Sequence, residues 1–273
     1  MATDVLSELY AELGKASPAR LAFTRKAFQM LPGLDHPAIL DIGCGQGGPS
    51  LELARLSHGQ VTGLDIDPVA LQELARRAEE EGLADRVHPV QGSLSDMHFP
   101  DEAFDIVWSE GTMYYIGFER ALAEWRRFIR PGGFLVVHDA VWRRPNPPEE
   151  LRTCEQLAYP GMQTAAEYIA KVPDHGYHLL GHLMLPEEFW EADYVVPALA
   201  RIGKLRIQHA GDEAAQRALD GEERAAEVCR KHSAWYGTVF LIMQKAGEAG
   251  LGTPVPPQAG LRAGPQSRAP ATG

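Results

Sequence analysis

Short apolar runs alternate with amphipathic segments along the first half of the chain. Five such runs predict strands, at residues 39–42, 61–64, 87–90, 104–108 and 134–138. The segments between them have the spacing of helices that bury one face. This alternation is typical of a parallel sheet, because parallel strands need long crossover connections that usually contain a helix. The pattern therefore predicts a doubly wound α/β core.

Helix boundaries are marked by capping residues and turns. Asp67, followed by a proline, predicts the start of a helix that Gly82 ends. Ser17, also followed by a proline, predicts another start. A further helix is expected from about Phe118 until the Pro-Gly-Gly turn that begins at Pro131.

The second half of the chain departs from this alternation. Prolines after residue 142 precede helical stretches and an apolar run at 177–185, and a polar helix at 213–232 precedes a last apolar run at 235–243. We predict N-terminal covering helices at 1–36, a core at 37–142 and 205–245, a lid or acceptor-binding insertion at 143–204, and a disordered tail at 246–273.

Charge and composition narrow the possible partners. The formal net charge of −11 repels a nucleic-acid backbone. No apolar run approaches the roughly 18 residues of a membrane-spanning helix, and the first residues lack the pattern of a signal peptide. The three cysteines are far apart in sequence, which predicts neither a disulfide framework nor a zinc site. We expect a cytoplasmic monomer or homodimer with no nucleic-acid and no membrane partner.

A glycine-rich segment follows the first predicted strand and opens a helix. Gly43, Gly45 and Gly48 allow the backbone to approach a nucleotide-like ligand closely, and Asp65 ends the next strand where a carboxylate can bind ribose hydroxyls. The same glycine spacing occurs in dinucleotide-binding proteins. Asp41 favours a cationic, amino-bearing ligand over a pyrophosphate, because a carboxylate would repel the latter.

Several segments, in order along the chain, resemble the motifs of class I S-adenosylmethionine-dependent methyltransferases. Residues 38–48 resemble the first motif, VTGLDIDP at 61–68 the ribose-binding strand, 91–94 the adenine-contacting turn, FDIVWSEG at 104–111 the fourth strand, and RPGGFLVV at 130–137 the fifth. The match covers roughly residues 36–142 and is nearest to the small-molecule branch around the ubiquinone and menaquinone biosynthesis methyltransferases.

This resemblance implies a fold and a reaction. The fold is Rossmann-like, with a mostly parallel seven-stranded sheet, an antiparallel last strand, helices on both faces and a small helical lid. The implied cofactor is S-adenosylmethionine, and the implied activity is methyl transfer to a small-molecule acceptor by in-line displacement, with S-adenosylhomocysteine as product.

The resemblance also implies cofactor-binding positions. Asp41 and Gly43 would lie near the methionine part, together with Ser109, and Asp65 would bind the ribose. Ser93 stands where the family often has an aspartate near the adenine, which leaves that contact in question. The other implied positions are Cys44, Gly45 and Gly47 in the loop, Ile66 and Leu94 beside the adenine, and Tyr10 and Arg25 on an N-terminal helix that closes over the cofactor. Arg25 could pair with the cofactor carboxylate or be an exposed helix arginine.

Polar and aromatic residues at the carboxyl ends of the fourth and fifth strands are candidate acceptor-site residues. They are Glu110, Tyr114, Tyr115, His138, Asp139 and Trp142. A carboxylate could hold a cationic or hydroxylated substrate, and a histidine could transfer a proton. The alternatives are core aromatics for the two tyrosines, a satisfied buried histidine, and an aspartate that caps a turn.

Three other interpretations remain open at this stage. His175, His178 and His182 could suggest a metal, but no cysteine or convincing carboxylate accompanies them, so we predict no metal site. An NAD-dependent oxidoreductase would use the same glycine loop. A non-catalytic module would bind S-adenosylmethionine without transferring its methyl group.

Overall fold

The structure, a computed structural model, describes residues 2–13, 17–159 and 161–247. The predicted disordered tail lies outside the described residues from position 248 onward. Within the described ranges, no helix is long and apolar enough to cross a membrane.

Seven strands form one sheet in the order β3-β2-β1-β4-β5-β7-β6. Their bounds are β1 Ala38–Ile42, β2 Gln60–Asp65, β3 Val87–Gln91, β4 Phe104–Glu110, β5 Ile129–Trp142, β6 Tyr177–Met184 and β7 Tyr236–Lys245. In this sheet of the described chain, β7 pairs antiparallel with both β5 and β6, and the other strand pairs are parallel. The predicted fold class is therefore confirmed, including the antiparallel last strand.

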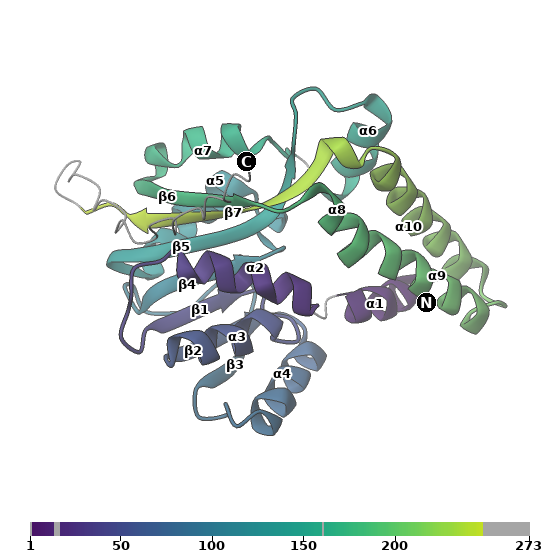
Figure 1. Cartoon of the computed structure of the whole chain (residues 1–273). Helices are drawn as coiled ribbons and strands as arrows, with labels where there is room; N and C mark the ends of the chain where they lie inside the picture. The colour runs from purple at the N-terminus through teal and green to yellow at the C-terminus, as the bar shows by residue number, and fades with distance from the viewer. Residues whose placement is uncertain (1, 14–16, 160, 248–273) are drawn as a thin grey trace, which may run out of the picture.

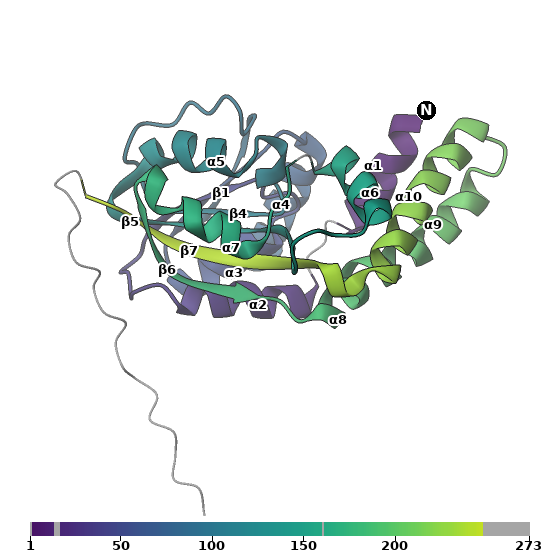
Figure 2. The ribbon, with the colours of Figure 1, turned by 90° about the horizontal axis from the view of Figure 1, so that it is seen from above.

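Helices cover both faces of the sheet. The first face is packed against α2 Pro18–Gln29, α3 Gly48–Ser57 and α4 Pro68–Glu80, and the second against α5 Phe118–Trp125 and α7 Ala165–Lys171. Figure 2 shows α2 and α5 on opposite sides of the strands. Alternate strand residues enter the two cores, Trp108 the first and Val107 the second, as the two-residue period of a strand requires.

A separate helical group lies beyond one end of the sheet (Figure 1). It consists of α1 Ala2–Leu13, α9 Val196–Gln208 and α10 Glu213–Lys231, which share a buried apolar cluster. The register pairs Trp142, the last residue of β5, with Tyr236, the first residue of β7. Because α10 leads into β7, this group lies at the carboxyl edge of the parallel strands.

Shorter elements complete the structure. They are η1 Met113–Tyr115, η2 Arg126–Phe128, α6 Glu149–Ala158, η3 Pro173–His175, α8 Glu187–Trp190, the π-helix η4 Glu191–Val195 and η5 Ser233–Trp235.

The predicted helix starts are confirmed. The Ser17 side chain accepts a hydrogen bond from the Arg20 amide at the start of α2, and that of Asp67 accepts one from the Val69 amide at the start of α4. Both starts have a proline at the first helical position, where its missing N–H costs nothing.

One predicted helix end was wrong. The helix from Phe118 ends at Trp125 rather than near Pro131, and β5 already begins at Ile129. Ile129 pairs with Phe104 of β4, and the register shifts before the next pairs. The Pro-Gly-Gly turn is therefore an irregularity inside a strand, since sheet pairing overrides the local helical pattern.

Two structural elements, β6 and α9, lie within or across the predicted insertion at 143–204, and the division of the chain itself stays a prediction. The apolar run at 177–185 forms β6, an edge strand of the sheet itself. The boundary at residue 204 falls inside α9, which packs against α1 and α10 as a unit. The role of the remaining segment as a lid stays a prediction.

Candidate functional site

The glycine loop between β1 and α3 is fixed to the neighbouring strand by backbone contacts. The amides of Gly43 and Cys44 both donate to the Leu64 carbonyl, at 2.8 and 3.0 Å. Gly43 has a φ of 72°, and an added Cβ would lie 2.2 Å from Cγ2 of Thr112. Only glycine therefore fits here without moving the segment after β4.

Asp65, at the carboxyl end of β2, is connected directly to this loop. Its Oδ2 accepts a hydrogen bond from the Gly45 amide at 2.8 Å, and its Oδ1 accepts one from the Asp67 amide at 2.9 Å. A carboxylate has about four acceptor positions, so about two remain for a ligand. The structure thus places Asp65 in contact with the glycine loop, and its binding of a ribose remains a prediction.

Asp41 lies beneath the loop rather than at its surface. Its side chain is buried, and Oδ2 accepts a hydrogen bond from the hydroxyl of Ser50 on α3. Burial raises the pKa of Asp41 to about 7, with contributions from Glu110 and Asp65, while the Ser50 hydrogen bond opposes the shift. A cation near this carboxyl would favour its ionised form.

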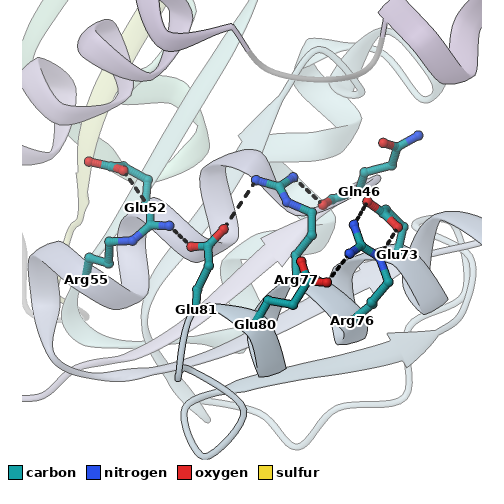
Figure 3. Close-up of polar contacts among 8 residues, drawn as sticks. All are labelled: Gln46, Glu52, Arg55, Glu73, Arg76, Arg77, Glu80 and Glu81. Atoms are coloured by element: carbon teal, nitrogen blue, oxygen red, sulfur yellow. Dashed lines mark hydrogen bonds and ion pairs between the residues drawn. The ribbon is translucent and has the colours of Figure 1, made fainter.

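A chain of ion pairs connects α3, α4 and the loop (Figure 3). Glu52 pairs with Arg55 at 2.9 Å, Arg55 pairs with Glu81, and Arg77 lies 3.8 Å from Glu81. Nη1 of Arg77 also donates to the carbonyl of Gln46, inside the glycine loop, at 2.9 Å. Arg77 thus connects α4 to the loop.

We expect Arg77→Met to weaken binding of S-adenosylhomocysteine by about threefold to tenfold, the effect of one charge-assisted hydrogen bond that positions the loop. Isothermal titration calorimetry measures this change. Arg76→Met is the matched control, because Arg76 bonds only to Glu73 and Glu80 among the residues that Figure 3 draws. Equal losses in both variants would show that Arg77 has no specific role.

The remaining predicted loop and adenine positions surround this geometry. Cys44 is buried, and Ile66, next to Asp65, is 70% exposed. Ser93 and Leu94 are half-buried in the turn after β3, and the Ser93 hydroxyl accepts from the Ser95 amide at 3.2 Å. These placements leave Ile66 accessible to a ligand, and the adenine contacts stay predictions.

Ser109 and Gly47 also lie close to the loop. The Ser109 hydroxyl is 2.7 Å from that of Thr112, which in turn donates to the Ile42 carbonyl at the end of β1. Gly47 has a φ of 79° and begins the turn into α3. Ser109 therefore helps hold the β4 and β1 ends together.

The two residues of the N-terminal helices that were predicted to close over the cofactor, Tyr10 and Arg25, have protein partners in this structure. Arg25 pairs with Glu52 on α3 at 2.7 Å, and the Tyr10 hydroxyl donates to Glu222 on α10. Gln46 in the glycine loop donates to the Ala11 carbonyl at 2.8 Å, so α1 does contact the loop. In this structure, the Arg25 guanidinium is part of the ion-pair chain, and its proposed contact with a cofactor carboxylate remains a prediction.

Glu110, the last residue of β4, and His138 of β5 lie side by side on adjacent strands. The register pairs them directly, so their side chains are on one face of the sheet. Oε1 of Glu110 accepts from Thr24 of α2 at 2.9 Å and from Trp108 at 2.8 Å. Neither Oε2 of Glu110 nor Nε2 of His138 has a hydrogen-bond partner in the described part of the chain, although both atoms are buried.

Asp139 and the two tyrosines lie at the other face of the same strand ends. Asp139 accepts from the amides of Tyr114 and Ala140, and burial raises its pKa to about 7. It therefore caps the η1 turn, one of the alternatives foreseen. Tyr114 stacks on Tyr115 with ring centroids 4.2 Å apart, and Tyr115 is 69% exposed, which excludes it as a core aromatic.

Sequence reasoning missed several residues that organise the site. No local motif identified Thr112, Ser50 or Arg77, because each acts through a contact with a residue that only folding brings close. Arg20 and Thr24 had one available signal, since residues four apart in a helix share a face.

Residues 39–133 match a family described as a methyltransferase domain. This part of the chain is therefore similar to a methyltransferase domain. A sterol 24-C-methyltransferase of Gibberella zeae is 39% identical over 102 residues, which are 37% of this chain and 27% of that protein. An uncharacterized methyltransferase of Bacillus subtilis is 35% identical over 136 residues, 50% of this chain and 57% of that protein. The chain therefore aligns with less than two thirds of the length of these relatives.

Solved structures share the architecture of this chain well beyond residues 39–133. A methyltransferase from Geobacter sulfurreducens, solved with S-adenosylhomocysteine, has a TM-score of 0.71 at 20% identity, covering 83% of this chain and 90% of that chain. The cyclase SpnF has a TM-score of 0.73 at 22% identity, covering 89% and 93%. At these identities the likeness shows the fold.

Proposed function

We propose that this chain transfers a methyl group from S-adenosylmethionine to a small-molecule acceptor. The observation that carries the proposal is the Asp65 carboxylate, bound through Oδ2 to the Gly45 amide of a glycine loop over a buried Asp41. The sterol 24-C-methyltransferases among the curated relatives support it through their names, which specify a sterol as the methyl acceptor.

The residues present fit the proposed cofactor. Asp65 retains acceptor positions for two hydroxyls, and an added Cβ at Gly45 meets no atom within 4 Å, so there is space beside the loop. Ile66 offers an exposed apolar side chain next to Asp65. Asp41 supplies negative charge for a cationic amino acid end and opposes a pyrophosphate.

Each group has a distinct task in the proposed reaction. When bound, S-adenosylmethionine supplies an electrophilic methyl group on a sulfonium. Asp65 and the loop amides fix the position of the nucleoside, while α1 contacts the loop through the bond between Gln46 and Ala11. Because positioning and exclusion of water contribute most to such a displacement, this rigid setting is the main catalytic device of the chain.

Thermal-shift titration tests the cofactor. S-adenosylhomocysteine should raise the melting temperature in a saturable way, whereas NAD should not. Formation of S-adenosylhomocysteine from S-adenosylmethionine, measured with a small-molecule extract, then tests transfer. Stabilisation by NAD alone would favour an oxidoreductase. Binding without turnover would favour a non-catalytic module or another reaction, since a cyclase shares this fold.

The pH dependence of S-adenosylmethionine binding should follow Asp41. Its pKa of about 7 means that the carboxyl is mostly neutral below that pH and ionised above it. We expect affinity for the cationic ligand to rise about tenfold from pH 6 to pH 8. Calorimetry on Asp41→Asn should show a flat profile over this range, because asparagine does not titrate.

The free protein should respond to pH with the opposite sign. The folded pKa of Asp41 lies above its ordinary value, so its contribution to stability is complete below that ordinary value and is lost as pH rises through about 7. Asp41→Asn should therefore gain stability relative to the native chain above pH 7 in denaturant titrations. An unchanged difference across pH would contradict the shift.

We further propose a cytoplasmic location, a monomer or homodimer, and neither a nucleic-acid nor a membrane partner. The net charge of −11 supports the absence of a nucleic-acid partner, because it opposes binding to a phosphate backbone. Among the described residues, Cys44, Cys154 and Cys229 form no disulfide, as expected in a reducing compartment.

A further inference from the structure

Two buried polar atoms without partners in the described chain belong to residues that are paired on the adjacent strands β4 and β5. They are Oε2 of Glu110 and Nε2 of His138, neither of which has a hydrogen-bond partner among the residues described. The His138 side chain is only 8% exposed, and the register places the two residues opposite each other on one face of the sheet. Leaving such atoms unpaired is costly, so a group that bonds to both is expected.

Side chains of α2 and β7 contact Glu110 and His138. Thr24 and Arg20, four residues apart on α2, both act on Glu110, the first by a hydrogen bond and the second by its charge. Arg20 is itself held by Asp193 of the π-helix η4, with Nη2 and Oδ2 2.7 Å apart. Phe240 stacks against the His138 ring at 4.4 Å.

The charges favour an uncharged occupant. Burial raises the pKa of Glu110, and burial together with the charge of Arg20 lowers that of His138 to about 3. Both shifts favour neutral side chains. With both side chains neutral, neither a cation nor an anion finds an oppositely charged partner in Glu110 or His138. Arg20 is already paired with Asp193 and so is not a free partner for an anion.

We propose that Glu110 and His138 form a subsite for an uncharged hydroxyl group of the methyl acceptor. This inference rests on the proposed function, because it names the acceptor class for the same site. A hydroxyl is suited to this position, since it donates one hydrogen bond and accepts others. It can therefore bond to the carboxyl oxygen and to the imidazole nitrogen at once. The substrate class is thus alcohols or phenols that carry no charge at this group.

Three probes of matched size and different charge test the subsite. Benzyl alcohol, benzylamine and benzoate are titrated against protein saturated with S-adenosylhomocysteine, and their dissociation constants are measured by ligand-observed NMR. Benzyl alcohol should bind about tenfold more tightly than either charged probe. Equal affinities, a preference for either charged probe, or no binding of the alcohol overturns the subsite. Failure of S-adenosylhomocysteine to bind overturns the proposed function instead.

His138→Phe separates a ligand contact from a structural role. Phenylalanine keeps an aromatic ring beside Phe240 and removes the buried nitrogen, so the melting temperature should be equal or higher. Affinity for benzyl alcohol should fall by about threefold to tenfold. A lower melting temperature with unchanged alcohol affinity shows a structural role and overturns the proposal.

Two further variants complete the test. Trp125→Phe is the matched control, because it also removes a buried nitrogen with no partner in the described chain, from α5 on the opposite face of the sheet. It should leave alcohol affinity unchanged. Glu110→Gln can keep the bonds from Thr24 and Trp108 through its amide oxygen. Because burial already holds Glu110 neutral, discrimination against benzoate should stay as in the native chain. A marked gain in benzoate affinity in this variant would show that Glu110 is ionised and contradicts the electrostatic argument.

Discussion

Replacing Asp65 by asparagine is expected to weaken binding of S-adenosylhomocysteine by about a hundredfold or more, because two charge-assisted hydrogen bonds to the ligand would be lost or weakened. The same change also disturbs the loop. In asparagine an NH₂ group replaces one of the two carboxylate oxygens, and it cannot accept a hydrogen bond. The side chain therefore loses the hydrogen bond from either the Gly45 amide or the Asp67 amide. Isothermal titration calorimetry measures the loss directly.

Asp67→Asn is the matched control for this experiment. Asp67 caps α4 by accepting from the Val69 amide, and asparagine caps helices equally well. Its backbone amide, which donates to Asp65, is unchanged. We expect an affinity within about twofold of the native chain. A comparable loss in both variants would mean that the whole edge, rather than the Asp65 carboxylate, is responsible, and an unchanged Asp65→Asn affinity would exclude it as a ribose ligand.

Gly45→Ala should reduce affinity for S-adenosylhomocysteine by about tenfold or more, the usual effect of an added methyl group in a closely packed contact. Gly45 has a φ of 52°, and its added Cβ would meet no protein atom within 4 Å. The methyl group therefore enters the space proposed for the cofactor without a clash in the free protein. Backbone strain should still lower stability by about 1–2 kcal/mol.

Gly82→Ala controls for that strain. Gly82 follows α4, has a φ of 66°, and an added Cβ there also meets nothing within 4 Å. The two variants should lose similar stability in thermal unfolding, and only Gly45→Ala should lose affinity. If both variants bind S-adenosylhomocysteine with equal affinity, the cofactor does not lie against Gly45.

Apolar runs predicted the positions of all seven strands, five from the alternation and two from the later runs at 177–185 and 235–243, although β5 extends from Ile129 to Trp142 rather than from 134 to 138. Buried parallel strands are continuous apolar runs, and their helices carry strong end signals such as Asp67, so local sequence and final fold agree. The exception is the segment around Ile129, whose helical pattern gave way to pairing with Phe104. That pairing joins residues distant in sequence and has no local signal.

Only part of the candidate site could be predicted, because contacts between residues distant in sequence have no local signal. Asp41, Asp65 and the glycines are close in sequence or occupy equivalent ends of neighbouring strands, so topology alone brings them together. Arg25 illustrates the limit, because its partner Glu52 is decided by how α2 packs on α3. The bond from Arg77 to Gln46 likewise depends on the packing of α4.

The amino-acid sequence by itself determined the succession of strands and helices along the chain. It also determined the glycine loop with its two carboxylates, because both depend on local spacing and on the period of buried positions. Only the tertiary structure decided which polar atoms find partners. Glu110 and His138 are 28 positions apart, and their pairing on adjacent strands arises from sheet register. Hydrogen bonds act over a few ångströms in space, whereas sequence patterns record distance along the chain, so such atoms are identified only after the chain has folded.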